Sequence, residues 1–204
     1  MRLSRRIFAG LLSMSTFYTP KQSHALDPLQ IRFCADVNRH TCIYLEDALK
    51  EQIAQRTTLM SQLGSLGVDI PVLPIHLHVA SNGGSLPSAL YMYDVLKEVP
   101  VLHTHVEGLV ASAATLFTVC GQHRTMTRHS TMLVHQPSAY ITGNVKFSEL
   151  RDEYVNMQRY TKVLLDIYNE TTTMSYSDFS SLIQNERYLS AEECLEFGFV
   201  DEIL

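Results

Sequence analysis

The chain alternates between two hydrophobic periods over most of its length. In residues 74–80 apolar residues alternate with His76 and His78, and this period of two predicts a β-strand. Residues 41–55 and 85–99 instead carry apolar side chains three and four positions apart, which predicts helices. Further strand-like segments are residues 30–36, 100–106, 131–135 and 199–204, and a long helical pattern covers about 145–170. This succession of strands and helices predicts an α/β fold with a largely parallel sheet.

Local signals mark several of the element ends. A connection that contains glycines, residues 61–71, separates the first helix from the strand that follows it. Near the end of the chain, Ser190 and Glu193 have the spacing of a capping box, and Gly198 is a typical helix stop. These signals predict a short closing helix followed by a final strand.

Two segments share one construction, a strand, a glycine turn and a helix. They read HVASNGGSLPSAL and THVEGLVASAATL, with the second turn expected at Glu107–Gly108. Turns that follow parallel strands meet at one edge of a sheet, where α/β folds place their sites. The first turn offers the bare N–H groups of Gly83 and Gly84, and the second places Ser112 at a helix start beside the N–H of Ala113. A hydroxyl next to two free N–H groups is the arrangement of a nucleophile with an oxyanion hole.

A nucleophilic serine needs a general base and an acid that orients this base. The segment MLVHQP supplies His135 at the end of a strand, and the proline after it ends regular strand pairing. Three carboxylates further along the chain are candidates for the acid: Asp166, Asp178 and Glu186.

These motifs, taken together, resemble a known family. From about Ile31 to Leu204 the chain is similar to the proteolytic subunit of the Clp protease, the ClpP family of serine peptidases. The strings that carry the resemblance are SNGG followed by a helix, GLVASAA, MLVHQP and RYLSAEECLEFGFVDEIL, and their order and spacing also match. The resemblance implies the ClpP/crotonase fold, with repeated β-β-α units, a largely parallel sheet and a protruding long helix at about 145–170.

The resemblance also implies roles for single residues. Ser112 would be the nucleophile and His135 the general base, with the N–H groups of Gly84 and Ala113 as the oxyanion hole. The family's catalytic acid is an aspartate immediately before a string of the form R-[FY]-L-S-A, and Glu186 occupies this position here. Glutamate also serves as the triad acid in other serine hydrolases.

The family resemblance further implies how the protein works. It implies self-association into two stacked heptameric rings, in which the long helix joins the rings, and an AAA+ unfoldase that hydrolyses ATP and delivers unfolded protein. No metal or small cofactor is expected, and the sequence has no nucleotide-binding P-loop. Two alternatives stay open: an inactive scaffold subunit of the same complex, and an acyl-CoA enzyme of the crotonase superfamily, which shares the fold.

The composition and charge of the chain limit the kinds of molecule that it is expected to bind. The 204 residues carry a net charge of −5, with 46% hydrophobic and 18% charged residues, as in an ordinary globular domain. Nothing in this balance favours binding to nucleic acid or to an anionic membrane, and no apolar run is long enough to span a bilayer. The four cysteines are scattered, so that neither a zinc site nor a disulfide framework is expected.

The first 26 residues differ from the rest and are expected to be a targeting segment that precedes a peptidase domain at 27–204. They contain arginines and a short apolar run but no acidic residue. An organellar transit peptide, for a mitochondrion or a plastid, is the favoured interpretation. The string SRRIFAG also fits a twin-arginine export signal, and a cytoplasmic protein with a loose terminus is the third alternative.

Two HxH pairs, His76/His78 and His103/His105, lie in strand-like segments. Residues two apart share one face of a strand, so that four imidazoles would cluster if the two strands were neighbours. Such a cluster could bind zinc. The more ordinary interpretation is that these histidines make hydrogen bonds within the protein, and no metal site is expected.

Overall fold

The computed structural model describes residues 29–204, so that the expected targeting segment lies outside the described residues. The helices are α1 (Arg39–Ser65), α2 (Leu86–Lys97), a 3-10 turn η1 (Ser112–Thr115), α3 (Leu116–Val119), α4 (Phe147–Thr171), α5 (Tyr176–Leu182) and α6 (Ala191–Glu196). The strands are β1 (Gln30–Phe33), β2 (Ile75–Ser81), β3 (Leu102–Ala111), β4 (His123–Met126), β5 (Thr131–Leu133), β6 (Tyr188–Leu189) and β7 (Glu202–Ile203).

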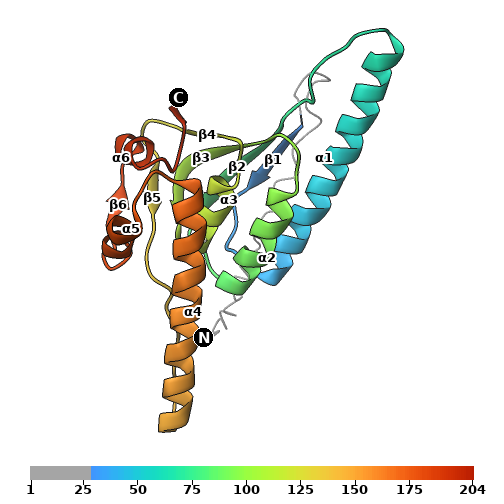
Figure 1. Cartoon of the computed structure of the whole chain (residues 1–204). Coiled ribbons are helices and arrows are strands. Elements are labelled where there is room, and N and C mark those ends of the chain that lie inside the picture. Colours follow the sequence, from blue (N-terminus) through green and yellow to red (C-terminus); the bar gives the residue numbers. More distant parts are fainter. Residues whose placement is uncertain (1–28) are drawn as a thin grey trace, which may run out of the picture.

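One sheet organises these elements (Figure 1). Its main path runs β1-β2-β3-β4-β7, all parallel, while β5 pairs with β3 and the short β6 pairs antiparallel with β5. The predicted α/β fold with a largely parallel sheet is therefore confirmed. β3 is the central strand, because its first half pairs with β4 and its second half with β5.

The alternation in β2 explains how the sheet is packed. Ile75, Leu77 and Val79 are fully buried in the core, whereas His76 and His78 on the opposite face are only half-buried. The helix expected at 85–99 is confirmed as α2, and the closing helix with its capping box is confirmed as α6. Ser85 accepts a hydrogen bond from the N–H of Ser88 at the start of α2, and Ser190 forms the expected capping box of α6.

Two expected boundaries are wrong. The turn at Glu107–Gly108 does not exist, because β3 continues through both residues to Ala111. Gly108 has a φ of 76° and donates its N–H to Ser130 Oγ, so that the strand bends there and changes its partner from β4 to β5. The helix expected at 41–55 extends to Ser65, because the first glycine of the connection continues the helix instead of ending it.

The predicted long helix is confirmed as α4. Its C-terminal half packs on the core through Leu164, Leu165 and Tyr168, whereas its N-terminal half projects beyond the rest of the molecule (Figure 1). The projecting half carries large exposed apolar side chains, among them Phe147 at 81% and Tyr154 at 63% exposure. Such a surface is unusual for a helix in water and is typical of an interface.

Candidate active site

Ser112 lies where the central strand ends. β3 stops at Ala111 and η1 begins at Ser112, whose φ of 56° is in the left-handed region that residues with a side chain rarely adopt. The strain is tolerated because the neighbouring turn packs tightly against it. A Cβ on Gly83 would lie 2.5 Å from the Ala111 carbonyl oxygen and 2.7 Å from Ser112 Cβ, so that only glycine fits there. Strained backbone of this kind is concentrated at functional sites.

Gly84 lies beside the same site, and its backbone N–H is not used by the neighbouring chain segment. Val37 forms a parallel bridge to Gly84, in which the N–H of Val37 donates to Gly83 O and the N–H of Ser85 donates to Val37 O, both at 2.7 Å. Because successive residues of an extended chain alternate their hydrogen-bonding groups, the N–H of Gly84 lies on the side away from Val37. Gly84 and Ala113 both line the cavity that contains Ser112.

His135 reaches Ser112 directly. It follows β5 by two residues, and the next residue, Gln136, is held by a hydrogen bond from its N–H to the carbonyl oxygen of Ile183. His135 Nε2 lies 2.7 Å from Ser112 Oγ, a hydrogen-bond distance, and the histidine side chain is 19% exposed. Two residues predicted from separate motifs are thus in contact through the atoms that a serine nucleophile and its base would use.

Glu186 is the acid nearest to this pair, but its contact is loose. Its Oε1 lies 3.7 Å from His135 Nδ1, longer than a hydrogen bond, and its side chain is 82% exposed. The other two candidates are occupied elsewhere: Asp166 pairs with Lys162 on α4, and Asp178 accepts a hydrogen bond from Ser175 at the start of α5. Within residues 29–204, Glu186 is the only carboxylate that forms an ion pair with His135.

A cavity of about 670 Å³ opens beside the Ser112–His135 pair. Its walls come from the start of α2, from the segment after His135 and from one face of α4. The buried lining residues include Val134, Leu164 and Tyr168, and the cavity is large enough for several residues of a peptide.

One contact that holds α4 against the segment of Ser112 was not predicted from the sequence. Thr115 Oγ1 donates to the Ser112 carbonyl oxygen and also forms a hydrogen bond with the hydroxyl of Tyr168 on α4. Tyr168 is buried and stacks on Phe179 with 4.6 Å between the ring centroids. Its hydroxyl partner is 53 positions away, and no local pattern relates the two residues.

The four histidines of the HxH pairs do cluster, because β2 and β3 are neighbours with His76 opposite His103 and His78 opposite His105. Within the described residues, no group of three or more His, Cys, Asp or Glu side chains is arranged to bind a metal ion. The four cysteines are all free. None of the helices in residues 29–204 is long and apolar enough to cross a membrane.

Comparison with known proteins identifies the family of the chain. The family model for Clp protease matches residues 29–204. ATP-dependent Clp protease proteolytic subunit 1 of Protochlamydia amoebophila is 29% identical over 168 residues, which cover 79% of this chain and 79% of the relative. Subunit 2 of the same protease from Mycolicibacterium paratuberculosis is 27% identical over 165 residues, or 79% of this chain and 81% of the relative. The chain therefore belongs to the Clp protease family.

Proposed function

We propose that the protein is a serine-type endopeptidase, the proteolytic subunit of a Clp-like protease that degrades unfolded proteins. The observation that carries this proposal is the 2.7 Å contact between His135 Nε2 and Ser112 Oγ, at a strained turn that opens into a large cavity. Membership of the Clp protease family supports the same reaction.

The proposed mechanism uses only side chains and backbone groups of this chain. Ser112 Oγ attacks the carbonyl carbon of the scissile peptide bond while His135 Nε2 takes up the hydroxyl proton. The N–H groups of Gly84 and Ala113 donate hydrogen bonds to the developing oxyanion. His135 then protonates the leaving amine, and a water molecule that is deprotonated by His135 hydrolyses the acyl-enzyme.

Glu186 is proposed to orient the imidazole ring of His135 and to stabilise its cationic form. The carboxylate is close enough for electrostatic attraction to Nδ1 but does not form a hydrogen bond to it in the single chain. We therefore assign Glu186 a weaker contribution than that of a buried triad aspartate.

The proposed working particle is an assembly. The exposed apolar half of α4 suits contact between two stacked heptameric rings, which the family resemblance implies. By the same resemblance an AAA+ unfoldase would supply the energy and the substrate. The relatives are named as subunits of ATP-dependent proteases, and the sequence of this chain has no P-loop of its own.

One observation favours a second candidate, an inactive scaffold subunit of the same complex. It is the exposure of Glu186 and its 3.7 Å distance from His135, which leave the base poorly oriented. The third possibility, an acyl-CoA enzyme, is disfavoured because CoA chemistry does not need a serine in contact with a histidine.

A covalent probe separates these candidates. A fluorophosphonate should label the assembled protein at Ser112, and the label should disappear in Ser112→Ala. Ser138→Ala is the matched control, since Ser138 lines the same cavity and His135 Nε2 is instead hydrogen-bonded to Ser112, and it should be labelled like the native protein. If the native assembly is not labelled and does not cleave a fluorogenic peptide, the peptidase proposal is wrong.

A further inference from the structure

Five histidines gather on one face of three neighbouring strands. His76, His103 and His123 lie opposite one another on β2, β3 and β4, and His78 lies opposite His105 on β2 and β3. All five are half-buried, on the face of the sheet opposite the core residues of β2. We call this group the histidine ladder, and the candidate active site does not use it.

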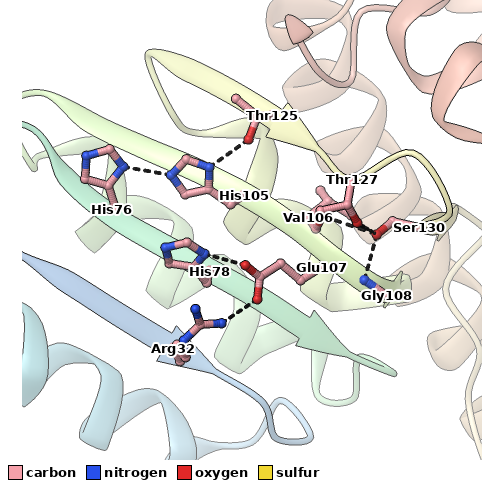
Figure 2. Close-up of polar contacts among 10 residues, drawn as sticks. All are labelled: Arg32, His76, His78, His105, Val106, Glu107, Gly108, Thr125, Thr127 and Ser130. Atoms are coloured by element: carbon pink, nitrogen blue, oxygen red, sulfur yellow. Dashed lines mark hydrogen bonds and ion pairs between the residues drawn. The ribbon is translucent and has the colours of Figure 1, made fainter. Parts of the chain in front are cut away.

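The rings of the histidine ladder are in direct contact. His76 Nδ1 lies 2.8 Å from His105 Nε2, and His105 Nδ1 lies 2.7 Å from Thr125 Oγ1 (Figure 2). His78 stacks on His105 with 4.5 Å between the ring centroids. The ring of His103 contacts the rings of both His76 and His123, with 5.2 Å between the centroids in each pair. The contacts therefore connect all three strands.

The 2.8 Å contact limits how many protons the ladder can hold. A hydrogen bond between two imidazole nitrogens needs a proton on one and a lone pair on the other. His76 and His105 can therefore be neutral together, or share one positive charge, but they cannot both be doubly protonated while the contact persists. Adding a second positive charge to the pair must therefore break the hydrogen bond between the two rings.

The charged groups around the ladder do not compensate full protonation. Glu107 accepts hydrogen bonds from His78 Nδ1 at 2.7 Å and from the guanidinium of Arg32 on β1, which already neutralises this carboxylate (Figure 2). Glu202 on β7 lies 3.3 Å from His123. Asp201, a third carboxylate near His123, is already neutralised by its ion pair with Arg124 on β4. Apart from this neutral pair, the balance of charges is unfavourable. Two carboxylates thus face five imidazoles and one guanidinium.

The buried position favours the neutral rings. Burial, and next the neighbouring imidazoles, lower the pKa values of His76 and His103 below their ordinary range. The same two causes lower the pKa of His105 to about 4. His78 Nε2 is buried without a hydrogen-bond partner among the described residues. Removing these rings from water disfavours their charged forms, as it does for any buried base.

We propose that the histidine ladder is a proton-operated switch: its neutral rings hold β2, β3 and β4 together, and their protonation in acid forces the strands apart. The second strand of the ladder, β3, leads directly into Ser112. Loosening this strand would displace the candidate nucleophile, so that acid would reversibly switch off the site at a pH where the rest of the fold persists.

Histidine-selective ¹³C NMR on the native assembled protein tests the switch without any substitution. The proposal predicts that His105 titrates well below pH 6.5, and that His76 titrates together with it in two coupled steps. His129 is exposed and lies outside the ladder, so that its signal serves as the internal reference. Independent titrations of His76 and His105 near the ordinary value would overturn the proposal.

A variant tests the consequence for the fold. His105→Gln keeps a hydrogen-bonding side chain but removes the titrating ring. The melting temperature is measured as a function of pH, and the midpoint pH of its decrease in acid should be lower in this variant by about one unit. His129→Gln is the matched control and should leave the midpoint unchanged. An unchanged midpoint in His105→Gln would refute the switch. Neither measurement depends on peptidase activity, so that the proposed function can fail independently.

Discussion

Replacing Glu186 by glutamine measures how much the loose acid contributes. Two charges 3.7 Å apart attract each other by about 1 kcal/mol in water. This value applies to Glu186, because its side chain is 82% exposed and the surrounding medium is mostly water. Loss of this attraction to the imidazolium of the transition state corresponds to a decrease of about sixfold in kcat/KM. A buried, hydrogen-bonded triad acid would instead contribute about 10⁴-fold.

The assay is hydrolysis of a fluorogenic peptide at low and at high salt. At 1 M salt the Debye length falls to about 3 Å, so that the difference between native protein and Glu186→Gln should shrink. Glu192→Gln is a close control, because Glu192 is also exposed and lies at the same 3.7 Å distance from its own partner, Arg128. It should leave kcat/KM unchanged.

Two results would refute this reasoning. A loss of more than about 10³-fold, independent of salt, would mean that Glu186 is hydrogen-bonded to His135 in the working particle. An unchanged kcat/KM would mean that Glu186 does not contribute to catalysis and that another residue orients His135.

Three further predictions follow from the geometry. Gly83→Ala should lower the free energy of unfolding by at least about 2 kcal/mol and abolish peptide cleavage, because its φ is 92° and the added Cβ meets Ala111 O at 2.5 Å; denaturant melts and the peptide assay check this. Phe147→Ser combined with Tyr154→Ser should yield a smaller particle in sedimentation velocity at unchanged helicity, because both side chains are exposed in the single chain. Stability should fall as the pH decreases from 6.5 to 4, because the unfolded chain then binds a proton that folded His105, with its pKa of about 4, does not. The full shift corresponds to about 3 kcal/mol, and solvent around the half-buried ring reduces this to about 1–2 kcal/mol in denaturant melts.

Each of these predictions has a control and a contradicting result. Gly67→Ala is the control for Gly83→Ala, because Gly67 also has a positive φ, 75°, but has open space around it. A similar loss of unfolding free energy in both variants would mean that backbone strain, and not the clash with Ala111, is the cause. Tyr176→Ser is the control for the α4 double variant, because it removes an exposed tyrosine outside α4. A double variant that still forms a particle of native size would contradict the proposed interface on α4. Stability that is constant between pH 6.5 and 4 would contradict the lowered pKa of His105.

The sequence predicted the features that depend on local patterns. The period of two in β2, the capping box at Ser190 and the long stripe of α4 are each short-range signals, and each element forms where it was expected. The pairing of Ser112 with His135 was also predicted, from the need of a nucleophile for a base, from the position of His135 at a strand end and from the family resemblance. The structure brings the two side chains into contact at the ends of the parallel strands β3 and β5.

Long-range geometry was not predictable in this way. Gly108 was interpreted as a turn, but a glycine with positive φ can also bend a continuous strand, and the difference depends on Ser130 beyond the next strand. The contact between Thr115 and Tyr168 depends on how α4 docks. Likewise, the position immediately before the RYLSA string identified Glu186, but its distance from His135 depends on the packing of that segment.

The central claim is that Ser112 is a nucleophile activated by His135. The most direct measurement is mass spectrometry of the assembled protein after reaction with a fluorophosphonate, at several pH values. The account predicts one label per subunit, located on Ser112, and its loss in His135→Ala although the serine is still present. Labelling that is absent from the native protein, or that persists at Ser112 without His135, would contradict it.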